Sequence, residues 1–317
     1  MEKSDNSHIV SEIKRIKSEK NAIILAHYYQ TDDIQDIADF VGDSLALSQK
    51  AASNTADIIL FAGVKFMAET AKILSPEKKV LLPDLEAGCS LSDSCEPENF
   101  KKFIANNPGR TIVTYVNTSA EIKALSDIVC TSSNALKIIE SLPKGEKILF
   151  APDRNLGNYI LNRTDRDMVI WDGSCHVHEE FSLEAVLELK EKNKEAKIIV
   201  HPECKLPIRM VADFIGSTSE LLNFTKMDSA KVFIIATEPG IIHQMVKENP
   251  EKIYIPAPGK DSTCGCSECR FMKLITLEKI HKTLVSESPE ILLDNEIIRL
   301  AQRPIRKMLE LSKILGL

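Results

Sequence analysis

The chain has 317 residues, and its hydrophobic content of 44% suffices for one large core or for two to three smaller ones. A net charge of −6, from 40 Lys and Arg against 46 Asp and Glu, lacks the basic excess of nucleic-acid-binding proteins. No run approaches the roughly 20 apolar residues of a membrane span, and the N-terminus carries no apolar signal core. We therefore expect a cytoplasmic protein with neither nucleic acid nor membrane as a partner.

The chain begins with an amphipathic helix, predicted over residues 7–20, and then repeats one pattern three times. The first strand of each repeat is a short apolar run, at residues 22–27, 111–115 and 197–201. These runs end at His27, Tyr115 and His201, which are 88 and then 86 positions apart.

A second strand and a helix start follow in each repeat, over residues 37–44, 125–132 and 211–218. The segments read Ile-Ala-Asp-Phe-Val-Gly-Asp-Ser, Leu-Ser-Asp-Ile-Val-Cys-Thr-Ser and Val-Ala-Asp-Phe-Ile-Gly-Ser-Thr. Their last residues, Ser44, Ser132 and Thr218, precede helical patterns and are predicted to be N-caps. Ser217 and Glu220 have the spacing of a capping box.

A third strand, a further helix and a fourth strand complete each repeat, and each fourth strand leads to cysteine. Short apolar strands are typical of parallel sheets covered on both faces. We predict an α/β protein of three similar parallel-sheet units, each a three-layer sandwich, related by a pseudo-threefold axis. The predicted units span residues 1–92, 93–180 and 181–270, and helices over 271–317, with apolar stripes on either side of Pro304, pack back on them.

Eight cysteines in an intracellular chain of this size favour metal binding or catalysis over a disulfide framework. Ligands of open parallel sheets bind beyond the carboxyl ends of the strands, and here those ends carry the cysteines. With the strand ends facing inward, the three units would share one site at their junction. Three thiolates would suit a [4Fe–4S] cluster with one open iron acting as a Lewis acid, or a catalytic zinc ion, and the spacing does not choose between them.

Several motifs closely resemble the quinolinate synthase family, from about Ala22 to the helix after Cys269. They include His27-Tyr-Tyr-Gln, Gly42-Asp-Ser-Leu, Pro83-Asp-Leu-Glu-Ala-Gly-Cys-Ser-Leu, Cys175-His-Val-His-Glu, His201-Pro-Glu-Cys and Gly216-Ser-Thr-Ser. The resemblance implies condensation of iminoaspartate with dihydroxyacetone phosphate to quinolinate, phosphate and water, in NAD biosynthesis. It also implies a [4Fe–4S] cluster, and an L-aspartate oxidase or dehydrogenase that supplies iminoaspartate.

The resemblance implies that the cluster ligands are Cys89, Cys175 and Cys269. The roles of Cys264 and Cys266 stay open, because this chain has Cys-x-Cys-x-x-Cys where some relatives have Cys-x-x-Cys-x-x-Cys. The remaining cysteines are interpreted as small buried fillers: Cys95, Cys130 and Cys204.

The resemblance also implies a set of substrate contacts: His27, Ser44, Tyr115, Val116, Asn117, Ser132, His201, Pro202, Glu203 and Thr218. Glu203 is the candidate general base, with Tyr29 and Tyr115 as proton donors or orienting groups and His201 assisting. His176 and His178 lie beside Cys175 in the sequence and are candidates to support a cluster ligand.

Two alternatives belong to other functional classes. An iron–sulfur electron carrier would need a fourth protein ligand and no substrate pocket. A zinc hydrolase on a single α/β barrel would be colourless and would have eight strands rather than about twelve.

Overall fold

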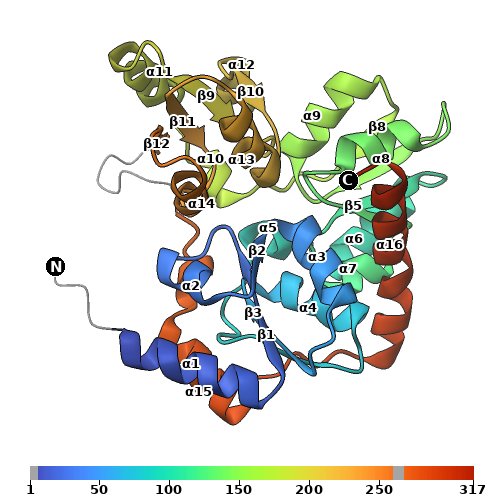
Figure 1. The fold of residues 1–317 in the computed structure, drawn as a ribbon. Coiled ribbons are helices and arrows are strands. Elements are labelled where there is room, and N and C mark those ends of the chain that lie inside the picture. The colour runs from blue at the N-terminus through green and yellow to red at the C-terminus, as the bar shows by residue number, and fades with distance from the viewer. Residues whose placement is uncertain (1–5, 260–267) are drawn as a thin grey trace.

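The computed structural model describes residues 6–259 and 268–317, and within them twelve strands form three separate four-stranded sheets (Figure 1). All strand pairs within the sheets are parallel, and each sheet has the same order, in which the second strand of a unit is followed by the first, third and fourth. This confirms three similar α/β units and excludes a single eight-stranded barrel. The exact unit boundaries stay predictions.

The elements follow one another in the same way in each unit. The first unit contains α1 (Ser7–Glu19), β1 (Ala22–His27), α2 (Asp32–Ile37), β2 (Phe40–Gly42), α3 (Ser44–Ser53), β3 (Ile58–Ala62), α4 (Lys65–Leu74), β4 (Lys79–Leu81) and α5 (Ser90–Asp93). The second contains α6 (Pro97–Asn106), β5 (Thr111–Tyr115), α7 (Ala120–Ala124), β6 (Ile128–Cys130), α8 (Ala135–Ser141), β7 (Ile148–Ala151), α9 (Arg154–Thr164), β8 (Met168–Ile170) and α10 (His176–Glu179). The third contains α11 (Leu183–Lys192), β9 (Lys197–Val200), α12 (Leu206–Met210), β10 (Phe214–Ile215), α13 (Thr218–Met227), β11 (Val232–Ala236), α14 (Ile241–Glu248) and β12 (Ile253–Pro256).

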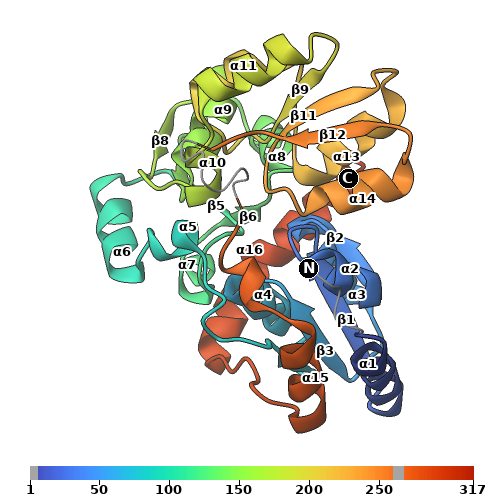
Figure 2. The same ribbon diagram turned by 90° about the vertical axis from the view of Figure 1, so that its left-hand side faces the viewer.

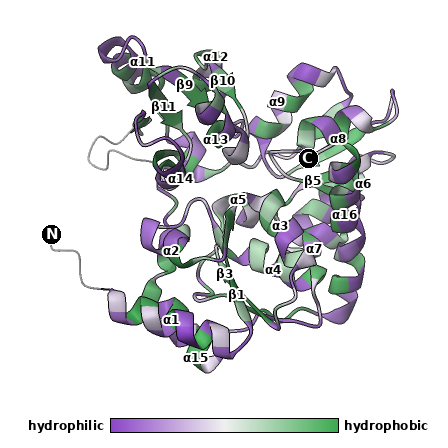
Figure 3. Cartoon of the chain, viewed as in Figure 1, coloured by the Kyte–Doolittle hydropathy of each residue, from purple (hydrophilic) through white to green (hydrophobic). Residues whose placement is uncertain are grey.

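Hydropathy explains why these segments pack as they do. In Figure 3, β1 and β3 are hydrophobic, whereas α1 alternates hydrophilic and hydrophobic residues. All residues of β3 are buried, and α1 buries Ile13 and Ile16 while its other faces carry charge. The strands are therefore covered on both faces by helices, as predicted for parallel sheets.

A repeated aspartate fixes the second strand of each unit beside the first. Each carboxylate accepts a hydrogen bond of 2.8 or 2.9 Å from the backbone N–H of a residue 15 positions earlier, and its own N–H donates to that residue's carbonyl. The pairs are Asp39 with Ile24, Asp127 with Ile112 and Asp213 with Ile198. This shared contact sets the register of each β-α-β start, so corresponding residues reach corresponding places in the three units.

The C-terminal segment contains the 3-10 helix η1 (Met272–Leu274), then α15 (Leu277–Ser286) and α16 (Asn295–Ile314). The sequence predicted separate apolar stripes on either side of Pro304, but α16 runs through this buried proline as one helix of 20 residues. It packs on α4 of the first unit and on α7, β6 and α8 of the second (Figures 1 and 2). The segment therefore packs back on the units, as predicted, and joins two of them.

No helix among residues 6–259 and 268–317 is long and apolar enough to cross a membrane.

Candidate active site

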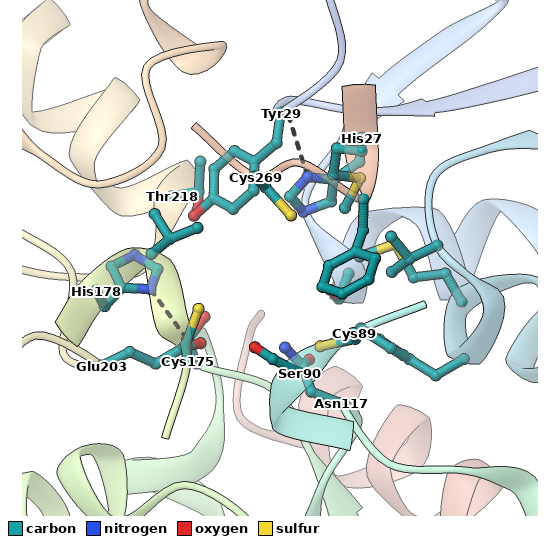
Figure 4. A pocket seen from close by; sticks show the side chains of 18 of the residues that line it. His27, Tyr29, Cys89, Ser90, Asn117, Cys175, His178, Glu203, Thr218 and Cys269 are labelled. Atoms are coloured by element: carbon teal, nitrogen blue, oxygen red, sulfur yellow. Dashed lines mark hydrogen bonds and ion pairs between the residues drawn. The ribbon is translucent and has the colours of Figure 1, made fainter. Parts of the chain in front are cut away.

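One pocket lies where the carboxyl ends of the three sheets meet, and it comprises about 620 Å³ of space, part of which is open to solvent (Figure 4). In each sheet the second strand lies on one side of the first strand and the third strand lies on the other side. Open parallel sheets bind ligands at such switch points. Fourteen of the residues singled out from the sequence line this pocket: His27, Tyr29, Ser44, Cys89, Tyr115, Asn117, Ser132, Cys175, His176, His178, His201, Glu203, Thr218 and Cys269.

The sulfur atoms of Cys89, Cys175 and Cys269 face the same central space from three sides (Figure 4). Burial raises the pKa of the Cys89 thiol to about 12, and it also raises the pKa of Cys175 and of Cys269. The three side chains are also close to one another: a negative charge on Cys269 raises the pKa of Cys89, and negative charges on Cys89 and Cys269 raise the pKa of Cys175. Three buried thiolates therefore need a cationic centre to compensate them, and this donor set fits a soft metal or a metal cluster.

Three further cysteines of the described residues lie away from the pocket. The side chains predicted to be fillers, at Cys95, Cys130 and Cys204, are buried and do not line the pocket. Cys264 and Cys266 lie outside the described residues.

The three repeated hydroxyl residues line the pocket, but they are not the helix caps that the sequence predicted. The caps of α3 and α13 are the preceding residues, Asp43 and Ser217, and the cap of α8 is Asn134. Ser217 and Glu220 form the predicted capping box. Ser44 and Thr218 are the first residues of their helices, and the preceding residues cap these helices. The hydroxyls of Ser44 and Thr218 are therefore not needed as caps and can face a ligand.

Two tyrosine hydroxyls cross from one unit to another inside the site. Tyr29 of the first unit bonds Thr218 and Thr237 of the third, at 2.9 and 2.8 Å. Tyr115 of the second unit donates a 2.5 Å hydrogen bond to Glu203 of the third. The arrangement of the pocket therefore depends on how the three units dock.

Glu203 is at the centre of a buried network of imidazoles. His178 places Nδ1 3.1 Å from a Glu203 carboxylate oxygen and Nε2 3.1 Å from the Thr237 hydroxyl. The rings of His178 and His201 stack with centroids 4.7 Å apart. Cys175, His178 and Glu203 offer three ligand atoms within 4.8 Å of one another, which is also the composition of a zinc site.

Burial fixes the protonation of most groups around Glu203. It lowers the pKa of His27 to about 4 and of His201 to about 3, so both imidazoles are neutral near pH 7. Burial, together with the charge of Glu203, raises the pKa of Tyr29 and Tyr115 well above the usual value, so both keep their protons. Burial would also raise the pKa of Glu203, but the adjacent His178 and the hydrogen bond from Tyr115 outweigh it, so this pKa lies below its usual value. The site thus combines an ionised carboxylate with neutral imidazoles and phenol donors.

Two of the expected substrate contacts do not line the pocket: Val116 and Pro202. Val116 packs in the hydrophobic core with 1% of its surface exposed, while Tyr115 and Asn117 on either side of it line the pocket. Pro202 lies in a turn between His201 and Glu203, which both line the pocket. The side chains of Val116 and Pro202 therefore do not reach the pocket, and a contact of either residue with substrate stays a prediction.

Ser90, which follows Cys89, is not among the residues singled out from the sequence. Its hydroxyl lies 2.8 Å from Nδ1 of His176, and this contact joins the turns that follow Cys89 and Cys175. His178 lies three residues after Cys175 at the start of α10, and this spacing places both side chains on one helix face. Both His176 and His178 line the pocket, and their support of a cluster ligand stays a prediction. His176 Nε2 and Asn117 Oδ1 are buried at the pocket and have no hydrogen-bond partner among residues 6–259 and 268–317, so each is available to a ligand.

The fold and the site together define a three-unit α/β protein with a cysteine-bearing pocket at the unit junction. The family model described as Quinolinate synthetase A protein matches residues 11–310. The chain is 58% identical over 300 residues to the quinolinate synthase of Microcystis aeruginosa, covering 95% of this chain and 94% of that protein. It is 57% identical to that of Rippkaea orientalis, covering 95% and 92%, and 52% identical to that of Chloroherpeton thalassium, covering 96% and 95%. The chain belongs to the quinolinate synthase family.

Proposed function

We propose that this chain condenses iminoaspartate with dihydroxyacetone phosphate to give quinolinate, phosphate and two molecules of water. The observation that supports this most directly is the meeting of Cys89, Cys175 and Cys269 beside the Glu203 network, in a chain of this family. In a cytoplasmic setting, an L-aspartate oxidase or dehydrogenase would supply iminoaspartate. The product enters NAD biosynthesis.

The three pocket cysteines would hold a [4Fe–4S] cluster. When bound by only three protein ligands, such a cluster supplies one iron with an open position that acts as a Lewis acid on substrate oxygen or nitrogen. The three buried cysteines support this assignment, because their thiolates would repel one another and therefore need a cationic partner to form. A pocket with room for substrate beside the sulfurs, and no described fourth cysteine in its lining, argues against a simple electron carrier.

Anionic substrates would be bound without basic side chains. The described lining of the pocket contains no Lys or Arg. Instead, the N-terminal turns of α3 and α13 reach it through Ser44 and Thr218, and helix N-termini present free N–H groups with partial positive charge. Carboxylate and phosphate groups would lie against these turns, with Asn117 and Ser132 as further polar contacts.

Proton transfers would be carried by the network around Glu203. The reaction requires enolisation, loss of phosphate, imine–carbonyl condensation and dehydration, and each step moves a proton beside a carbonyl or an imine. Glu203 is the group that accepts protons, while the protonated hydroxyls of Tyr29 and Tyr115 donate or orient and His201 assists. Glu203 is 3% exposed, so bulk water is excluded from these transfers.

The test is anaerobic purification followed by iron, sulfide and zinc analysis and an assay for quinolinate from the two substrates. We expect a coloured protein with about four iron and four sulfide per chain, as the cluster formula requires, and quinolinate formation. Serine at position 89, 175 or 269 should abolish both, whereas Cys95→Ser, at a buried cysteine outside the pocket, should preserve them. Colourless protein with one zinc per chain would instead support a zinc site at Cys175, His178 and Glu203. A cluster with four protein ligands would support an electron carrier.

A further inference from the structure

A fully buried carboxylate, Glu238, lies just outside the pocket and belongs to no role described so far. It follows β11 and is 0% exposed. One of its oxygens accepts a 2.7 Å hydrogen bond from the N–H of Gly240. Its other oxygen accepts the backbone N–H of Cys269 at 3.3 Å and lies 2.9 Å from the ammonium of Lys273. Glu238 therefore bonds directly to the backbone of the third cysteine.

Lys273 extends this contact to the first unit. Its ammonium also donates a 2.8 Å hydrogen bond to the backbone carbonyl of Tyr29, and its own N–H donates to the carbonyl of Cys269 at 3.2 Å. The short turn from Cys269 to Lys273 is thus closed on itself and attached at both ends. Cys269, Phe271 and Met272 face the pocket from the inner side of this turn.

The surroundings of Glu238 leave little freedom for adjustment. A Cβ at Gly240 would lie 2.8 Å from a Glu238 carboxylate oxygen, and 2.8 and 2.9 Å from backbone oxygens of the first unit. The side chain of Gln35 donates to three carbonyls there, those of Tyr28, Gln30 and Gly240. Glu238 is therefore held at a close junction between the first unit, the third unit and the Cys269 turn.

The third cysteine needs such a support more than the other two. Cys89 and Cys175 come eight and five residues after the ends of their strands, β4 and β8, whereas Cys269 comes thirteen residues after the end of β12. A strand end thus does much to place the first two sulfurs and little to place the third. The contacts of Glu238 and Lys273 supply the missing constraint.

We propose that Glu238 and Lys273 are positioning residues that hold the Cys269 turn against Tyr29, so that its sulfur stays in place opposite Cys89 and Cys175. Neither residue lines the pocket or is assigned a contact with substrate. The proposal rests on the proposed function, because it presumes that Cys269 binds a cluster. Loss of the Glu238 or Lys273 contacts would misplace one ligand and so weaken retention of the metal, because supporting contacts commonly tune the affinity of metal ligands.

The test compares Glu238→Gln, Lys273→Met and the double variant with the native chain, all reconstituted anaerobically. Iron and sulfide per chain, the rate of iron release to a chelator and the electron paramagnetic resonance spectrum of the reduced protein are measured. We expect roughly 10- to 100-fold faster iron release and an altered spectrum in both single variants. The double variant should be little worse than the worse single one, because the two side chains act as one unit.

Glu290→Gln is the matched control, since it removes the carboxylate of another partly buried pair, with Lys72 at 3.2 Å, outside the pocket lining. Its iron release should match that of the native chain. Release within twofold of native in both Glu238→Gln and Lys273→Met would overturn the proposal, and so would equal acceleration in the control. If Glu238→Gln does not fold, Lys273→Met decides, because it keeps the bond from Glu238 to Cys269 and removes the ion pair with Glu238 together with the link to Tyr29. A native chain that takes up no cluster would instead refute the proposed function.

Discussion

A Glu203→Gln substitution separates proton transfer from metal binding. The amide keeps the volume of the side chain and one oxygen for the 2.5 Å hydrogen bond from Tyr115, but it removes the negative charge 3.1 Å from His178 and cannot accept a proton. A positioned general base contributes about 10²- to 10⁴-fold to rate, which corresponds to about 3 to 5 kcal/mol of barrier. We expect kcat for quinolinate to fall by this factor while KM changes only a few-fold.

The assay measures quinolinate formation together with iron, sulfide and the visible absorbance of the anaerobically reconstituted variant. Iron and sulfide should stay at the native level, because all three cysteines are intact. Glu69→Gln is the control, since this buried carboxylate accepts a backbone hydrogen bond of 3.0 Å from Ala120 and does not line the pocket that all three cysteines share. Near-native turnover by Glu203→Gln would refute its role as proton acceptor. A loss of turnover that only mirrors a loss of iron would refute the separation of the two roles.

Three further predictions concern the scaffold. Ser217→Ala should lower the free energy of unfolding by about 1 kcal/mol, seen as a lower urea midpoint, because it removes the cap of α13; an unchanged midpoint would contradict this. Asp127→Ala should cost about 1.5 to 3 kcal/mol in the same assay, because the Ile112 N–H loses a charged acceptor at 2.9 Å, whereas Asp127→Asn should retain much of the native midpoint. Hydrogen bonds from two lysines lower the pKa of Glu287 to about 2 from 4.5, so its stabilising effect is complete above pH 4.5 and is lost as the pH falls toward 2. The urea midpoint of Glu287→Gln should accordingly fall less than that of the native chain between pH 7 and pH 3, and equal falls would argue against the effect.

The threefold repeat accounts for most of what could be predicted. Apolar runs ending at His27, Tyr115 and His201 predicted the first strands of three sheets, and parallel sheets bring strand ends to one edge. The same argument placed Cys89 and Cys175 beside a common pocket before any contact was known. Local pattern and sheet topology suffice for these residues because the strands themselves position them.

What could not be predicted depends on contacts between the units. Ser44 looked like a helix cap, and only the structure shows that the preceding Asp43 caps α3, whereas the capping-box spacing already indicated Ser217 as the cap before Thr218. The roles of Thr237 and Glu238 come from partners on other units and on the C-terminal segment, which no local pattern encodes. Val116 stands between Tyr115 and Asn117 in a family motif, and only the structure shows that its side chain packs in the core while theirs line the pocket.

The tyrosine hydroxyls that cross between units have a consequence for how activity is lost. Tyr29 and Tyr115 form hydrogen bonds with residues of the third unit, so the proposed catalytic arrangement depends on the docking of the units and not on any one sheet. A mild denaturant that separates the third unit from the other two would leave every strand paired and yet scatter the reacting groups. Inactivation should therefore precede the loss of secondary structure, because the interfaces between the units separate before the sheets unfold.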